Sequence, residues 1–335
     1  MRLGVGGLFK LVDKEFAYTI VASDKAFDQG YDSGEDREFN WIDWKLGTEL
    51  YDATLTVGKQ KENFTHDLQM LLVDQAFMER PMAVTALLSS RNTGVLLRDT
   101  AFDERMSWSV GSYFDMFDDR DEPFEDSKEY IARFTGLPYV SANEEKFVHV
   151  GFGYRYADTG SSLLRFSTGP ETIFSPAFVD TGEFAATSTS STNIEFGFKH
   201  GPVWLISEFL RTDVNANDFN DPTFDGFHVS GIWALTGEQR GYDRRQGLFG
   251  KLTPLASVRA GGIGAWELVA RYSDVDLSNG LIEGGDMSRV SVGVNWWPSR
   301  EFKGTIQYGR VDLDRDGISS SSNIIQLRAA MLLGL

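Results

Sequence analysis

The sequence has no cysteine, and among its 335 residues it has only nine prolines and four histidines. Without cysteine it can form no disulfide, no thiolate metal site and no cysteine nucleophile. The histidines are His66, His149, His200 and His228. Their scattered positions do not match the close pairing of a zinc site, and no G-x-S-x-G, phosphate-loop or H-E-x-x-H motif is present. We therefore predict no catalytic residue, no metal centre and no cofactor.

Basic residues and long apolar runs are also scarce. Lysine and arginine number 32 against 49 aspartates and glutamates, which gives a net charge of −17. A nucleic-acid partner requires a basic face, so none is expected. No stretch approaches the roughly 18 apolar residues of a membrane helix. The mean hydropathy of −0.25 does not exclude a membrane β-barrel, in which lipid-facing and lumen-facing residues alternate.

Apolar and polar residues alternate through much of the chain. In residues 147–156, one face carries Val148, Val150, Phe152, Tyr154 and Tyr156, and the other carries His149, Gly151, Gly153 and Arg155. Residues 193–199, 227–235, 290–296 and 323–335 repeat the pattern. Period-two alternation predicts β-strands, and apolar faces that end in aromatic residues are typical of transmembrane barrels. We predict an all-β, transmembrane antiparallel β-barrel; a soluble β-sandwich or propeller is the alternative.

The connections differ in length, as in outer-membrane barrels with short turns on one side and longer loops on the other. Short links lie at 13–14, 100–104, 200–202 and 298–301, and longer polar links at 24–37, 115–126, 213–222, 277–285 and 312–322. Residues 61–91 and 158–191 are longer still and contain apolar side chains. We predict that both fold into a single barrel domain, residues 1–335, and narrow it. Without them we count about fifteen strands.

Three motifs offer competing interpretations. Gly261, Gly262 and Gly264 suggest a dinucleotide loop, but the residues that follow alternate as a strand. Asp312, Asp314 and Asp316 match the first half of a calcium loop, whose twelfth position holds Asn323 instead of glutamate. A solvated turn is favoured there, with calcium as a weak alternative. The acidic run 115–126 is most simply a solvated loop and could hold divalent cations against lipopolysaccharide.

Several segments resemble the phosphate-selective porins O and P. Residues 264–273 and 292–298 resemble that family's closing strands, and 235–238 with 251–254 resemble the long connection before them. Residues 57–64 and 77–80 resemble the strand that enters its constriction loop. The resemblance implies a 16-stranded outer-membrane barrel, usually a homotrimer, whose inward loops concentrate arginine and lysine. It places five residues at or beside the pore lining: Lys59, Lys61, Arg80, Arg91 and Arg165.

The resemblance also implies a ladder of arginines that begins at Arg165. Ser167 and Gly169 stand where further rungs are expected. A ladder offers successive always-charged donors to phosphate, so the missing rungs predict weak anion preference or none.

Three functions remain open from the sequence. The first is a passive channel for small anions or general hydrophilic solutes, in contact with the lipid bilayer and lipopolysaccharide. The second is a structural outer-membrane barrel that anchors lipopolysaccharide or a surface layer. The third is a soluble secreted ligand-binding protein.

The first strand of the barrel is expected to lie before residue 1. Outer-membrane barrels have even strand numbers, and residues 2–7 resemble the second strand of the family. The alternative is that residues 161–168 span the membrane and complete sixteen strands.

Overall fold

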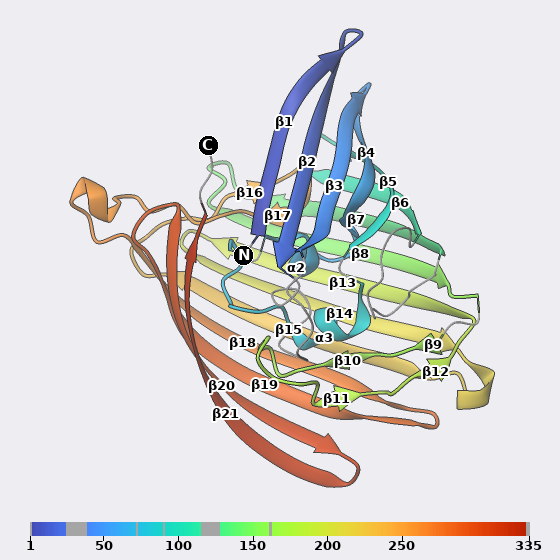
Figure 1. Ribbon diagram of the computed structural model, residues 1–335. Helices are drawn as coiled ribbons and strands as arrows, with labels where there is room; N and C mark the ends of the chain where they lie inside the picture. Colours follow the sequence, from blue (N-terminus) through green and yellow to red (C-terminus); the bar gives the residue numbers. More distant parts are fainter. Residues whose placement is uncertain are drawn as a thin grey trace.

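The computed structural model describes residues 2–24, 39–71, 73–89, 91–114, 128–160 and 163–332. Fifteen antiparallel strands form one large sheet, in which nearly every strand pairs with the strands next to it in sequence (Figure 1). Its first eight strands are β1 (Arg2–Leu11), β2 (Lys14–Asp24), β3 (Phe39–Leu50), β4 (Ala53–Lys61), β5 (Arg91–Ala101), β6 (Met106–Phe114), β7 (Lys128–Val140) and β8 (Lys146–Asp158). The others are β13 (Ser188–His200), β14 (Val203–Asn215), β15 (Thr223–Ala234), β18 (Ala265–Asn279), β19 (Ile282–Trp297), β20 (Phe302–Arg315) and β21 (Ile318–Met331).

The two faces of each strand differ as the alternation predicts. On β8, Val150 and Phe152 are 42% and 47% exposed, whereas His149 and Arg155 are fully buried. The exposed apolar residues therefore form the outer surface of the sheet, and the polar residues point inward. An apolar outside with a polar inside is the arrangement of a transmembrane barrel, and it confirms the predicted fold class.

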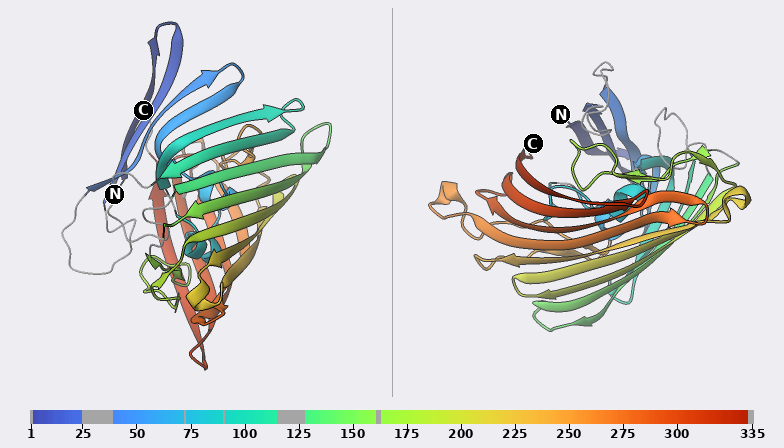
Figure 2. Two further views of the ribbon diagram at one scale, coloured as in Figure 1. Left: turned by 90° about the vertical axis from the view of Figure 1, so that its right-hand side faces the viewer. Right: turned by 90° about the horizontal axis from the view of Figure 1, so that it is seen from below.

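The sheet curves around a filled interior, and its end strands β1 and β21 lie on the same side of the molecule (Figure 2). Within the described residues β1 pairs only with β2, and β21 only with β20. The alternative in which residues 161–168 supply a further spanning strand is wrong. β9 (Leu163–Leu164) and β10 (Ser167–Thr168) instead form two-residue ladders with β12 (Phe184–Ala185) and β11 (Val179–Asp180), outside the large sheet.

Three connections of the described part of the chain enter the space that the sheet encloses. Inner loop 1, described over residues 62–71 and 73–89, contains the short helices α2 (His66–Gln69) and α3 (Met82–Leu87). Inner loop 2, described over residues 159–160 and 163–187, contains β9 to β12. The third connection, residues 235–264, carries the small hairpin of β16 (Tyr242–Asp243) and β17 (Leu248–Phe249). Two single-turn 3-10 helices, Asn217–Phe219 and Val258–Ala260, are the remaining elements of the described residues. None of the helices in the described part of the chain is long enough to cross a membrane.

The main apolar core lies inside the barrel and joins the two inner loops. Phe64, Met82 and Leu87 of inner loop 1 pack in one buried cluster with Phe166 and Phe184 of inner loop 2. Phe166 and Phe184 also contact Phe224 of β15, with ring centroids 5.3 and 6.3 Å away. Buried apolar area of this kind stabilises at about 25 cal/mol per Å². It explains why the sequence places apolar residues in these two loops.

Gly58 on β4 is expected to be intolerant of any side chain. Its φ of +123° is rare for other residues, and an added Cβ would lie 2.1 Å from the carbonyl oxygen of Trp44. Gly58→Ala should therefore destabilise the β3–β4 pair, by at least about 1–3 kcal/mol from the backbone conformation alone. Heat-dependent mobility of the folded barrel in detergent gels would measure the loss. Gly231→Ala on β15 is the matched control, because its added Cβ meets nothing within 4 Å.

Candidate pore and constriction

A cavity of about 860 Å³ lies between the β1–β5 wall, inner loop 1 and the 235–264 connection. Its charged lining residues are Asp13, Glu15, Asp43, Glu49, Asp74 and Asp243, together with Lys14, Lys45, Lys61, Arg91 and Arg98. Six carboxylates therefore face five cations. Charges of both signs are distributed around this cavity, so neither sign of small ion is strongly excluded from it.

A buried carboxylate on β14 attaches inner loop 1 to the wall of the barrel. The N-terminus of α2 leaves backbone N–H groups without helical partners. Glu208 of β14 accepts hydrogen bonds from two of them, at 2.7 Å from the His66 nitrogen and 3.0 Å from the Asp67 nitrogen. Thr65 caps the same helix by accepting from the Leu68 nitrogen at 3.1 Å. These bonds fix the position of α2 inside the barrel.

Further wall residues donate to the loop's backbone carbonyl oxygens. Asn193 of β13 donates to Phe64, and Asn295 of β19 donates to Ala76 at 2.8 Å. Lys303 of β20 donates to Gln75. Inner loop 1 is thus attached to the β13–β21 wall and leaves open space on the β1–β5 side.

The 235–264 connection meets inner loop 1 inside the barrel. The Phe249 backbone nitrogen donates to Nε2 of His66 at 3.0 Å, and Arg240 donates to the carbonyl oxygen of Asp74 at 2.5 Å. Burial holds the pKa of His66 well below its usual range, so the imidazole is neutral near pH 7 and its Nε2 can accept this bond. The sequence indicated only a long connection here. Its inward fold was not predicted, because these contacts join residues that are more than 160 positions apart in the sequence.

The inward-facing arginines of the filled side are neutralised by glutamates. Arg133 forms a two-point contact with Glu195, at 2.7 and 2.8 Å. Arg240 contacts Glu267 in the same way, at 3.0 Å for each bond. Arg155 pairs with Glu62 and Glu129, and Arg289 and Arg271 lie beside Glu171. Bidentate pairs of this type are strong and geometrically specific. These arginines are therefore structural and do not offer free charge to a passing anion.

These ion-paired arginines and glutamates were not predicted from the sequence, although the sequence carries a signal for them. The inward positions of strands with alternating polarity carry both arginine and glutamate, as at Glu129 of β7 and Arg155 of β8. Charge of both signs on the hidden face of neighbouring strands predicts internal ion pairs.

Of the residues predicted to line the pore, Lys61 and Arg91 line the cavity. Nζ of Lys61 also donates to the carbonyl oxygens of Gln69 and Met70, at 3.1 and 2.7 Å. Arg91 contacts Asp43 at 3.3 Å. Arg80 reaches the Leu68 and Met70 carbonyl oxygens, both at 3.3 Å. Burial lowers the pKa of Arg80 to about 10, so it stays charged at neutral pH and suits the carbonyl end of α2.

Lys59 and Arg165 lie elsewhere. Lys59 is buried opposite Trp44 and Thr93 in the sheet and is not part of the cavity lining. The side chain of Arg165 is 54% exposed and pairs with Asp180 at 2.7 Å within inner loop 2. Ser167 also lies in inner loop 2, opposite Asp180, and a Cβ added at Gly169 would lie 3.1 Å from the Pro176 carbonyl oxygen.

The acidic hairpin between β20 and β21 does not have the shape of a calcium loop. Asp312 and Asp314 lie on the outer face of β20, and Asp316 and Gly317 form the tight turn to β21. This hairpin does not wrap around an ion as a calcium loop does. The acidic run 115–126 lies outside the described residues.

A buried group formed by Asp67, Glu208 and His228 also has the residue types of a metal site. The carboxylate of Glu208 already accepts the two α2 bonds and lies 3.2 Å from Nε2 of His228. Burial raises the pKa of Asp67, whereas Arg271 and His228 lower it. The guanidinium of Arg271, 3.7 Å from the Asp67 carboxylate, supplies the cation that balances this group.

A large antiparallel sheet with an apolar outer face, inner loops and a cavity lined by charged residues defines an outer-membrane β-barrel of the porin class. A family model for phosphate-selective porins O and P matches residues 1–331. The chain belongs to this family and localises to the bacterial outer membrane.

Individual relatives are distant. Porin O of Pseudomonas aeruginosa is 25% identical over 198 residues, which are 50% of this chain and 44% of that protein. An uncharacterised protein of Caulobacter vibrioides is 33% identical over 91 residues, 27% of this chain and 18% of that protein. The matches therefore span less than half of these curated relatives.

Solved structures share the fold at low identity. OmpT of Vibrio cholerae, as a loop L8 deletion mutant, is 14% identical with a TM-score of 0.59, over 98% of this chain and 89% of that one. An anion-selective porin from Comamonas acidovorans is 10% identical with a TM-score of 0.59, over 98% and 88%. DcaP of Acinetobacter baumannii is 11% identical with a TM-score of 0.58, over 99% and 84%.

Proposed function

We propose that this chain is a passive diffusion channel for small hydrophilic solutes, with weak anion preference or none, and that it catalyses no reaction. The observation that carries the proposal is the cavity, which is lined by six carboxylates and five cations. Strong selectivity requires a ring of one charge. Here the inward arginines that could form one are paired with glutamates.

In this proposal the chain forms one β-barrel domain, and residues 61–91 and 158–191 narrow its pore. Lys61, Arg80 and Arg91 set the positive side of the narrowest level, because Lys61 and Arg91 line the cavity and Arg80 shares the Met70 carbonyl with Lys61. Lys59 and Arg165 lie farther from the narrowest level of the pore than these three residues. Phosphate selectivity is not part of the proposal, since Ser167 and Gly169 replace two arginines of the family's ladder.

Asp74→Asn is expected to shift the channel toward anions. Asp74 lines the cavity from inner loop 1, so its neutralisation leaves five carboxylates against five cations. The reversal potential in a potassium chloride gradient across a planar bilayer would show the shift. Asp316→Asn in the exposed β20–β21 turn is the control and should change nothing. An unchanged potential in Asp74→Asn would show that ions do not pass this residue.

The proposed partners are the lipid bilayer, lipopolysaccharide and two further copies of the chain. A structure of OmpT of Vibrio cholerae described as a trimer form shares the fold, with 13% identity and a TM-score of 0.53. It supports a homotrimer as the assembly. Light scattering of the detergent-solubilised protein, corrected for detergent, would measure the number of copies.

A second function, the anchoring of lipopolysaccharide, is favoured by a row of carboxylates on the outer face. In the register of β15, β18, β19 and β20, Asp225 lies opposite Asp276, and Asp276 lies opposite Asp286. Asp286 in turn lies opposite Asp314. Like charges directly opposite one another destabilise a sheet. Divalent cations shared with lipopolysaccharide phosphates would remove that repulsion. If so, magnesium should increase the retention of lipopolysaccharide by the purified barrel, and Asp276→Asn with Asp286→Asn should abolish the increase.

A further inference from the structure

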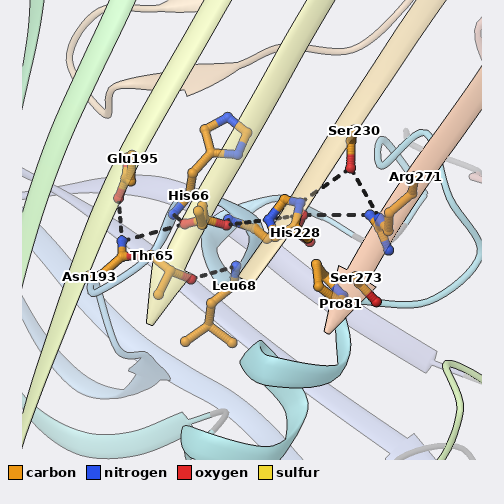
Figure 3. A network of polar contacts seen from close by, with 12 residues as sticks. Thr65, His66, Leu68, Pro81, Asn193, Glu195, His228, Ser230, Arg271 and Ser273 are labelled. Carbon is orange, nitrogen blue, oxygen red and sulfur yellow. Dashed lines mark hydrogen bonds and ion pairs between the residues drawn. The ribbon is translucent and has the colours of Figure 1, made fainter. Parts of the chain in front are cut away.

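Arg271, on β18, is 4% exposed and contacts inner loop 1 at several points. Its guanidinium donates to the Glu79 carbonyl oxygen at 2.9 Å and lies 3.7 Å from the Asp67 carboxylate. The same group lies 3.9 Å from the centre of the Phe77 ring, a distance at which a cation and an aromatic ring attract. Nε donates to the wall residue Ser230 at 3.1 Å (Figure 3). Arg271 thus connects β15 and β18 to both halves of inner loop 1.

The same guanidinium also contacts inner loop 2. Glu171 of that loop is 5% exposed, and its carboxylate lies 3.5 Å from Arg271. Its other oxygen accepts a hydrogen bond from Ser273, two residues further along β18. Glu171 has a φ of +52°, a conformation that costs a side-chain-bearing residue free energy and is kept only where surrounding contacts require it. The contacts with β18 supply that requirement.

A continuous chain of polar contacts therefore runs from one side of inner loop 1 to inner loop 2. Glu208 contacts His228 at 3.2 Å, and His228 lies 3.8 Å from Asp67. Asp67 and Glu171 then share Arg271. A planar guanidinium with five N–H donors can hold several acceptors at once, which a lysine ammonium cannot do in the same geometry.

We propose that Arg271 is a positioning residue that couples the two inner loops, so that a disturbance of one loop is transmitted to the other. The pore would then widen and narrow through joint movement of both loops. This deepens the proposed channel function, but the coupling itself does not depend on which solute passes. It can be measured without any current.

Amide hydrogen exchange on the purified, detergent-folded barrel tests the coupling. Glu208→Gln weakens the attachment of inner loop 1 alone, because among the described residues Glu208 contacts His66, Asp67, His228 and Asn193 and none of inner loop 2. With Arg271 present, exchange should accelerate in inner loop 1 and also in inner loop 2. The increase should be about tenfold or more, as expected for a lost hydrogen bond to a charged group. With Arg271→Met added, Glu208→Gln should accelerate exchange in inner loop 1 only.

The reciprocal experiment uses Arg289→Met, which removes donors to the Pro170 and Glu171 carbonyl oxygens of inner loop 2. This variant should accelerate amide hydrogen exchange in inner loop 1 only while Arg271 is present. Arg271→Lys keeps the charge, but it should abolish the transmission between the loops as Arg271→Met does. If the role of Arg271 were purely electrostatic, the transmission in Arg271→Lys would equal that of the unmodified protein. Arg211→Met, which removes an exposed arginine paired with Asp213, is the control for loss of an arginine.

Acceleration confined to inner loop 1 in Glu208→Gln, with Arg271 intact, would overturn the coupling. That result decides the matter even if Arg271→Met fails to fold. A barrel that conducts normally but shows no transmitted exchange would refute the coupling and leave the channel proposal standing. Transmitted exchange in a barrel that does not conduct would support the coupling and refute the channel proposal.

Discussion

Glu195→Ala is expected to lower the free energy of unfolding by about 3–5 kcal/mol, as when one partner of a buried ion pair is removed. The carboxylate of Glu195 is fully buried and accepts two bonds from Arg133 at 2.7 and 2.8 Å. It also lies 3.0 Å from His149 and accepts from Asn193 at 2.9 Å. Its loss leaves the Arg133 charge buried without a carboxylate, which accounts for the size of the effect. Urea unfolding in lipid vesicles would measure it.

The double variant Arg133→Met with Glu195→Leu is the control. It removes both charges and should recover part of the lost stability, because an ion pair replaced by apolar residues can be nearly neutral in energy. Equal stability of the parent and Glu195→Ala would contradict the description of this side of the barrel as held by internal ion pairs.

Replacing residues 66–87 of inner loop 1 with a short glycine–serine linker is expected to raise single-channel conductance several-fold. The loop brings α2, α3 and the apolar residues around Phe64 into the barrel, so its removal widens the path for ions. Recordings in planar bilayers would show the increase, with heat-dependent gel mobility as the test that the barrel still forms.

The same linker inserted at the β20–β21 turn, Asp316–Gly317, is the control and should leave conductance unchanged. Unchanged conductance after shortening of inner loop 1 would mean that the ion path is limited elsewhere. The 235–264 connection would then be the next candidate, since it also borders the cavity.

The strands could be predicted from the sequence because each carries its own signal. Alternation on β8, such as Val150 and Phe152 against His149 and Arg155, depends only on neighbouring residues and on the two-sided environment of a barrel wall. Among the described residues the large sheet has fifteen strands, in agreement with the approximate number counted from the sequence. The apolar residues of 61–91 and 158–191 likewise distinguished these segments from solvated loops.

The contacts inside the barrel could not be predicted in the same way. Arg165 and Arg289 are each followed by an apolar residue in the sequence, Phe166 and Val290, yet Arg165 is half exposed and Arg289 is fully buried. Which arginine meets which glutamate depends on strand register and on how the inner loops fold. These are tertiary properties, and only the resemblance to a family suggested particular pore residues.

The conductance of the purified, unmodified protein in a planar lipid bilayer tests the central claim most directly. A passive channel with a mixed-charge lumen predicts stepwise current increases on insertion that scale with bulk salt concentration, and a reversal potential near zero in a salt gradient. Folded barrel that inserts without any current step would contradict the channel and favour a structural role. Current that saturates at micromolar phosphate would contradict the lack of selectivity.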